Sequence, residues 1–214
     1  MSSMKRGSAA IVGVAESDIG SVAADMSVID LMAQGTVRAL RDAGLTLSDV
    51  DGIFCATTQA RTSAMSLAEY LKKPDAYVDS TIVGGSSFEI HVAHAQAAIE
   101  AGLCSVAVVA YGSTQRSAGR KNASPREFNP YETPFKPFMP STAYAMAANR
   151  HMHEYGTTRE QLAEVAVAAR KWAQLNPVAF DQRPLDIAGV LNAKMVSYPF
   201  TVRDCCLVTD GGGA

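Results

Sequence analysis

A turn rich in glycine and serine separates an apolar segment from a helix-forming segment in the first half of the sequence. Residues 84–87 read Gly-Gly-Ser-Ser; the apolar segment before them is 76–83, and the helical pattern runs from Ser87 to Gly102. Glycines let the backbone turn sharply or approach a ligand closely, and a serine here caps a helix whose first N–H groups point outward. The turn therefore predicts a ligand or reaction site at the start of the helix.

Four residues of this region are candidates for the chemistry. Gly85, Ser86 and Ser87 lie at the helix start, where the helix dipole favours a developing negative charge. His91 follows Ser87 by four residues, a spacing that permits contact on one helix face. A serine hydroxyl is a poor nucleophile without an adjacent base. The alternative interpretation is structural, with Ser87 as the helix cap and His91 as a packed or partner-facing residue.

Composition and charge exclude several classes of function. The chain has 214 residues, of which 48% are hydrophobic and 19% charged, and its formal net charge is -2. This length and hydrophobic content suit one α/β core. The slightly negative net charge leaves no basic patch for nucleic acid. Apolar runs stay below the ~18 residues that a membrane-spanning helix needs, and the first residues lack a signal-peptide core. We expect a cytoplasmic protein that binds neither nucleic acid nor a membrane.

The cysteines do not indicate a metal site. There are four of them, and their spacing is neither that of a zinc site nor that of a secreted disulfide scaffold: Cys55, Cys104, Cys205 and Cys206. None lies in the glycine-serine turn. We therefore expect no bound metal, and any chemistry at the turn has to proceed without a cysteine from the turn itself.

Strand-like and helix-like segments alternate through the first 112 residues. Apolar runs typical of buried strands lie at 9–14, 51–56, 76–83 and 105–111, and helical patterns lie at 27–44, 64–71 and 87–102. A strand-helix-strand order implies parallel pairing through right-handed crossovers. The expected fold class is therefore α/β, a parallel-rich mixed sheet with helices on both faces.

The pattern changes after Gly112. Residues 113–140 hold five of the nine prolines, and helical segments follow at 141–155, 159–175 and 184–193. A long irregular segment inside a compact domain is commonly a binding loop. We expect residues 1–112 to be the first part of an α/β domain, residues 113–200 an inserted loop and helical region, and residues 201–214 the start of a return to the core sheet.

Several of these segments, in this order, resemble the thiolase superfamily, and more narrowly its lipid-transfer-protein or sterol-carrier type. They are residues 10–14, the turn 84–87, the Ala-Gly pair 101–102 before the strand at 106–110, and the segments 155–158, 176–179 and 204–211. The resemblance implies a thiolase fold, of which the chain would be the N-terminal half with the C-terminal half absent. It also implies a homodimer, with a coenzyme A thioester as substrate and no tightly bound cofactor.

The turn departs from the pattern of that family. Its members carry a nucleophilic cysteine at the start of the central helix in a Cys-x-Ser-Gly pattern, and aligning the serine on Ser87 places Gly85 at the cysteine and Phe88 at the glycine. The resemblance therefore implies an acyl-CoA-binding protein, an acyltransferase or an enzyme of retro-aldol or Claisen type, that works without the usual cysteinyl thioester. Related proteins that lack this cysteine form complexes with an OB-fold and zinc-ribbon partner.

Two alternatives accompany this hypothesis. The first is a non-catalytic, thiolase-like binding or scaffold subunit of a larger complex. The second is a dinucleotide site, which ranks last because the turn lacks the third spaced glycine and follows the third strand of the sheet rather than the first. The family's second half ordinarily supplies the histidine that activates the nucleophile, so we expect activity in the full-length protein and none in these 214 residues alone.

Overall fold

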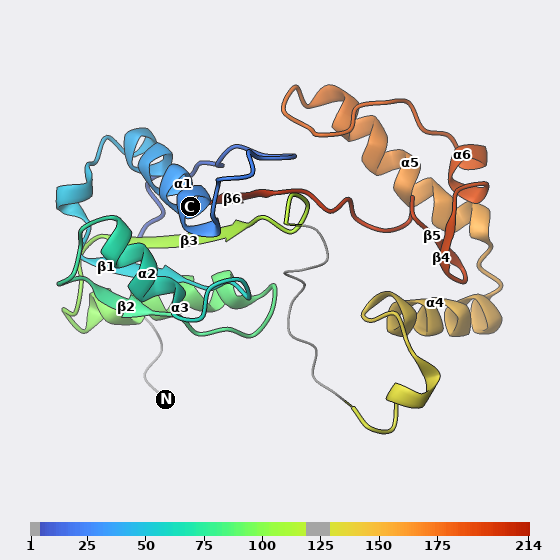
Figure 1. The fold of residues 1–214 in the computed structure, drawn as a ribbon, viewed down its shortest axis with the longest axis horizontal. Coiled ribbons are helices and arrows are strands. Elements are labelled where there is room, and N and C mark those ends of the chain that lie inside the picture. Colours follow the sequence, from blue (N-terminus) through green and yellow to red (C-terminus); the bar gives the residue numbers. More distant parts are fainter. Residues whose placement is uncertain (1–4, 119–128) are drawn as a thin grey trace. The chain divides into compact units, whose positions relative to one another are not determined.

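The computed structural model describes residues 5–118 and 129–214 (Figure 1). These residues form two compact units, one made of residues 5–118 and 208–214 and the other of residues 129–207. Within the described ranges, no helix combines the length and the apolar character needed to cross a membrane.

The first unit is built on a four-stranded sheet of order β2-β1-β3-β6 (Figure 1). Strand β1 (Gly52–Cys55) pairs in parallel with β2 (Tyr77–Asp79) on one side and with β3 (Ala107–Ser113) on the other. Strand β6 (Gly211–Gly213) pairs with β3 in the antiparallel direction. The sheet is therefore parallel-rich and mixed, which confirms the predicted fold class.

Helices cover both faces of this sheet. Neighbouring residues of a strand point to opposite faces, and the successive apolar residues of β1 therefore need cover on both. Ile53 and Cys55 of β1 pack with side chains of α1 (Val28–Asp42) and α2 (Ser63–Tyr70). Phe54 packs on the other face with Ala95 and Ala98 of α3 (Ser87–Glu100). The central strand is therefore buried on both sides, as its unbroken apolar sequence predicts.

Local signals set the ends of the helices. Asp30 N–H donates to Ser27 Oγ at 3.2 Å, and Ser27 N–H donates to Asp30 Oδ2 at 2.8 Å. This reciprocal capping box satisfies two backbone donors that the first turn of α1 leaves unpaired. Thr158 and Gln161 form the same arrangement at the start of α5 (Arg159–Leu175). Both helix starts confirm the sequence prediction.

The predicted strand at residues 9–14 is wrong. Its side chains Ile11 and Val12 are 74% and 62% exposed, and the backbone pairs with β6 only from Ala15, whose N–H donates to Ala214 O at 2.9 Å. The segment instead passes over the end of α1, where Gly13 lies too close to Ala39 for any side chain. The apolar run therefore does not mark a strand.

Strand β2 is shorter than the apolar segment that predicted it. It ends at Asp79, whose Oδ1 accepts hydrogen bonds from Thr81 N–H and Thr81 Oγ1, each at 2.7 Å. This local turn directs the chain away from the sheet. Residues 80–86 therefore form a loop between β2 and α3 instead of a longer strand.

The second unit is mainly helical. It contains α4 (Ser141–Tyr155), α5, α6 (Ile187–Leu191) and the two-stranded sheet of β4 (Met195–Ser197) and β5 (Phe200–Thr201). A small core joins α5 to α6 through Ala163, Val167 and Val190. Two short 3-10 helices, Leu47–Asp49 in the first unit and Thr133–Phe135 in the second, complete the described elements.

Candidate functional site: a pocket at the start of α3

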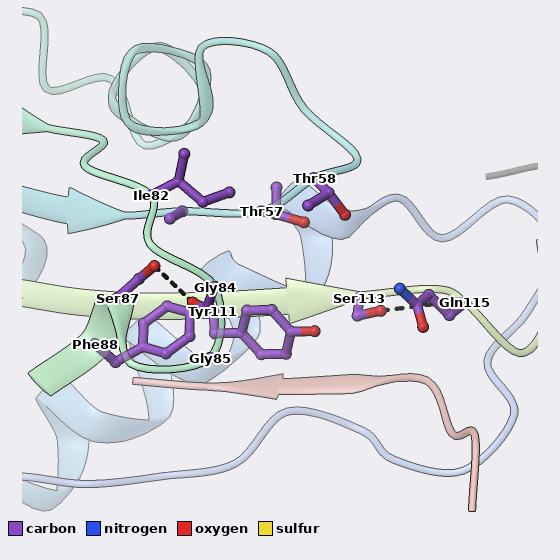
Figure 2. Close-up of a pocket in the computed structure, with 11 residues that line it drawn as sticks. Thr57, Thr58, Ile82, Gly84, Gly85, Ser87, Phe88, Tyr111, Ser113 and Gln115 are labelled. Atoms are coloured by element: carbon purple, nitrogen blue, oxygen red, sulfur yellow. Dashed lines mark hydrogen bonds between the residues drawn. The ribbon is translucent and has the colours of Figure 1, made fainter. Parts of the chain in front are cut away.

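A pocket of about 400 Å³ lies at the carboxyl end of the parallel strands of the first unit. Its walls come from the residues after β1, the loop between β2 and α3, and the end of β3 (Figure 2). The lining consists of Ala56, Thr57, Thr58, Ile82, Gly84, Gly85, Ser87, Phe88, Tyr111, Ser113 and Gln115. Ligands of α/β sheets bind characteristically at this edge. Among the predicted residues, Gly85 and Ser87 line the pocket, whereas Ser86 and His91 do not.

The two glycines of the loop have different structural roles. Gly84 adopts a φ of +83°, a left-handed conformation that side chains with a Cβ rarely adopt. Gly85 does not have a positive φ, and a Cβ placed on it would meet no atom within 4 Å. Gly84 is therefore required by the backbone, whereas Gly85 leaves space in the pocket that a side chain could occupy.

Ser87 is fully buried and holds the loop together. Its Oγ donates to Gly84 O at 2.7 Å (Figure 2). The same Oγ accepts from Val83 N–H at 3.0 Å. The N-cap residue of α3 is the exposed Ser86, whose side chain makes no capping hydrogen bond. The prediction that one of these serines caps the helix with its side chain is therefore wrong, because the Ser87 hydroxyl bonds to the preceding loop instead.

His91 lies fully buried behind the pocket wall. Its Nε2 is 2.9 Å from Thr81 O, and because a carbonyl only accepts, Nε2 carries the proton. Its Nδ1 has no hydrogen-bond partner in the described structure. Burial lowers the pKa of His91, although the Thr81 hydrogen bond and the Asp79 charge oppose this shift. His91 is therefore a neutral, packed imidazole, which agrees with the structural interpretation of this residue.

Ser87 and His91 do not form a nucleophile and base pair. The Ser87 hydroxyl proton is directed to Gly84 O, and the ring of His91 packs edge-on against Phe88 with centroids 5.9 Å apart. Activation of a serine requires a hydrogen bond from its hydroxyl to the base. The i, i+4 spacing therefore brings the two residues to the same helix face without joining them chemically.

Sequence reasoning missed the polar wall formed by β3. Tyr111, Ser113 and Gln115 all line the pocket, and Tyr111 packs against Phe88 with ring centroids 5.1 Å apart at 63° (Figure 2). Residues separated by two in a strand share one face. Polar residues alternating at the carboxyl end of an apolar strand were the signal that could have identified this wall.

No residue that lines the pocket is a cysteine. Cys55 immediately precedes the lining residue Ala56, but its side chain lies in the core under α1 and α2. Burial raises the pKa of Cys55 to about 12, so its thiol stays protonated at neutral pH. In residues 5–118 and 129–214, no three histidine, cysteine, aspartate or glutamate side chains group to hold a metal ion.

No family model matches the chain. A curated relative does: the sequence is 33% identical over 223 residues to the 17-hydroxy-3-oxo-4-pregnene-20-carboxyl-CoA lyase of Mycobacterium tuberculosis, a match that covers 99% of this chain and 57% of that protein. The chain spans about half the length of the curated relatives it matches.

Two solved structures place the fold. The Ltp2-ChsH2(DUF35) aldolase has a TM-score of 0.80 and 29% identity, covering 95% of this chain and 53% of that one. A monomeric SCP2-thiolase like protein type 1 from Mycobacterium smegmatis has a TM-score of 0.74 at 18% identity, covering 94% of this chain and 43% of that one. With its parallel-rich sheet and the pocket at the start of α3, the chain belongs to the thiolase superfamily.

Proposed function

We propose that this chain provides the reaction pocket of an enzyme that breaks or forms a carbon-carbon bond next to a coenzyme A thioester, without a cysteinyl thioester. The observation that carries the proposal is Gly85. It lines the pocket at the start of α3 where a side chain would fit, yet it offers no group to acylate. The buried Cys55, with its raised pKa, cannot take over this role.

Retro-aldol cleavage needs no covalent enzyme intermediate. The hydroxyl on C3 of a 3-hydroxyacyl thioester loses its proton, the C2–C3 bond breaks, and C3 leaves as a carbonyl compound. The electron pair moves to C2 and the thioester oxygen as an enolate, which then takes up a proton at C2. Oriented hydrogen-bond donors stabilise such an enolate. The polar wall of β3 supports this role for the pocket, because it holds hydroxyl and amide groups opposite the loop of Gly85.

The relatives support a CoA thioester as substrate. One is named as a lyase of a carboxyl-CoA compound, and one solved structure is that of an aldolase. In this proposal the thioester enters as substrate and is not a tightly bound cofactor. Acyl transfer is the alternative chemistry for the same pocket.

The test uses the full-length protein, alone and with any partner that co-purifies. Incubation with a 3-hydroxyacyl-CoA should yield a carbonyl compound and a shortened acyl-CoA, as measured by liquid chromatography and mass spectrometry. The intact mass of the protein should stay unchanged after incubation with acetyl-CoA. A stable acyl adduct on residues 1–214 would overturn the proposal that catalysis avoids a covalent step.

A non-catalytic subunit is the second candidate. Ser87 and His91 are both engaged in structural contacts, so the start of α3 presents no activated nucleophile. A binding or scaffold subunit would bind acyl-CoA without turning it over. Calorimetric binding of acyl-CoA together with no product, with and without the partner, would favour this candidate over the enzyme.

We also propose two protein partners. Strand β2 is one edge of the sheet, and its Tyr77 and Val78 remain 38% and 39% exposed, which favours pairing with β2 of a second copy.

The solved aldolase joins Ltp2 to ChsH2(DUF35), which supports a heterologous partner subunit for this chain as well. The expected OB-fold and zinc-ribbon protein would be such a subunit. Light scattering of the full-length protein should give the mass of a homodimer. Val78→Lys should weaken the pairing of β2 with its copy and lower the measured mass.

A further inference from the structure

The polar wall of β3 suggests a specific role for one of its residues. Tyr111 and Ser113 are two positions apart in β3, so their side chains share the face of the sheet that carries α3. Gln115 lies just after the strand and lines the same pocket. In Figure 2 the ring of Tyr111 lies beside Phe88, and its hydroxyl points along β3 toward Ser113. The wall thus brings three polar side chains into one cavity with Gly85.

Most hydroxyl groups of this pocket already have partners. Ser87 Oγ is engaged with Gly84 and Val83. Thr57 Oγ1 accepts from Gln59 N–H at 3.3 Å, and Ser113 Oγ accepts from Gln115 N–H at 3.4 Å. These bonds leave the Thr57 and Ser113 protons without an acceptor, but both side chains are buried. Tyr111 is 38% exposed, and its hydroxyl makes no hydrogen bond to any residue of the described structure. Its proton is therefore available to a molecule inside the cavity.

One aromatic contact orients the ring of Tyr111, and the sheet fixes its backbone. Phe88 packs on it edge-on, and Phe88 itself packs at 81° against the buried His91. The backbone of Tyr111 is fixed by the antiparallel pairing of β3 with Gly213 of β6. A hydrogen-bond donor that is already oriented loses little conformational entropy when the substrate binds. It therefore stabilises developing charge better than a mobile donor does.

We infer that the Tyr111 hydroxyl is a catalytic residue that donates a hydrogen bond to the thioester oxygen of the bound substrate. This inference rests on the proposed function. When the C2–C3 bond breaks, negative charge develops on that oxygen, and the phenol stabilises it while keeping its own proton. The proton of the C3 hydroxyl passes to water, and C2 takes up a proton from water, so the step needs no oxidant or reductant.

Replacement by phenylalanine tests this role. Tyr111→Phe in the full-length protein removes only the hydroxyl and keeps the ring contact with Phe88, so the melting temperature should not change. We expect kcat for cleavage of a 3-hydroxyacyl-CoA to fall roughly 100-fold or more, with KM within about threefold. Tyr144→Phe is the matched control, because Tyr144 is an exposed tyrosine on α4 that does not line the pocket. A kcat within twofold of the unmodified protein would overturn the inference.

A binding measurement decides the role of Tyr111 independently of turnover. Acetonyl-CoA keeps the carbonyl oxygen but cannot be cleaved as a thioester, whereas propyl-CoA lacks that oxygen. Tyr111→Phe should weaken binding of acetonyl-CoA about fivefold and leave propyl-CoA unaffected. Equal effects on both analogues, or none, would overturn the inference. A wild-type protein that binds both analogues but cleaves no CoA thioester would contradict the proposed function alone.

Discussion

The buried hydroxyl of Ser87 donates a hydrogen bond to the carbonyl oxygen of Gly84 at 2.7 Å. It also accepts one from Val83 N–H at 3.0 Å, so a single side chain joins the start of α3 to the loop before it. This loop carries Gly85 and forms one wall of the pocket. Ser87 therefore shapes the pocket, and its hydroxyl proton is not directed to a base.

Removing the Ser87 hydroxyl should destabilise the protein. Ser87→Ala leaves Val83 N–H and Gly84 O without this partner, and we expect the free energy of unfolding to fall by about 1 to 2 kcal/mol in urea denaturation. The exposed Ser86 is the control, and Ser86→Ala should change the free energy by less than about 0.5 kcal/mol. Full stability of Ser87→Ala with complete loss of activity would instead identify Ser87 as a reacting group.

The two glycines of the loop should respond differently to the same substitution. Gly84→Ala forces a Cβ into a backbone with φ of +83°, and we expect a loss of roughly 1 to 2 kcal/mol. Gly85→Ala meets open space and should cost less than about 0.5 kcal/mol. Urea denaturation of both variants measures the difference. Equal losses would contradict the distinct roles assigned to the two positions.

Gly85→Cys should place a reactive thiol in the pocket. The side chain has room there, so we expect the variant to fold and to be alkylated by iodoacetamide, as located by peptide mass spectrometry. Cys55 serves as the internal negative control because it is buried and its pKa is raised to about 12. The exposed Cys206 serves as the positive control. An introduced thiol that resists alkylation while Cys206 reacts would show that position 85 does not face an accessible cavity.

His91 should make stability depend on pH. Burial lowers its pKa in the folded protein below the ordinary 6.5, so below about pH 6.5 the unfolded chain binds more protons than the folded one. The stabilising contribution of neutral His91 to the free energy of unfolding is therefore fully present above about pH 6.5 and is lost as the pH falls below it. Denaturation at pH 7.5 and pH 5.5 measures this loss.

Two variants isolate the contribution of His91. His91→Gln keeps an amide donor for Thr81 O but does not titrate, so the loss between pH 7.5 and 5.5 should become smaller. His151→Gln removes an exposed imidazole on α4 and should leave the loss unchanged. An undiminished loss in His91→Gln would assign the pH dependence to other groups.

Much of the secondary structure could be predicted because its signals are local. Ser27 with Asp30, and Thr158 with Gln161, are separated by three residues, and each pair caps its helix as the sequence indicates. The apolar run of β1 also predicted a strand buried on both faces. The run at residues 9–14 is also apolar, yet its Ile11, Val12 and Val14 are exposed, because burial depends on which distant segments lie beside it.

The amino-acid sequence by itself determined the fold class, the starts of α1 and α5, and the absence of a cysteine from the turn at Gly85. Only the tertiary structure decided what surrounds that turn. Tyr111 lies 26 positions beyond Gly85 in the chain and lines the same pocket because β3 ends beside the start of α3. Ser87 likewise bonds to the loop rather than to its helix. Such contacts depend on packing between segments, which sequence spacing does not encode.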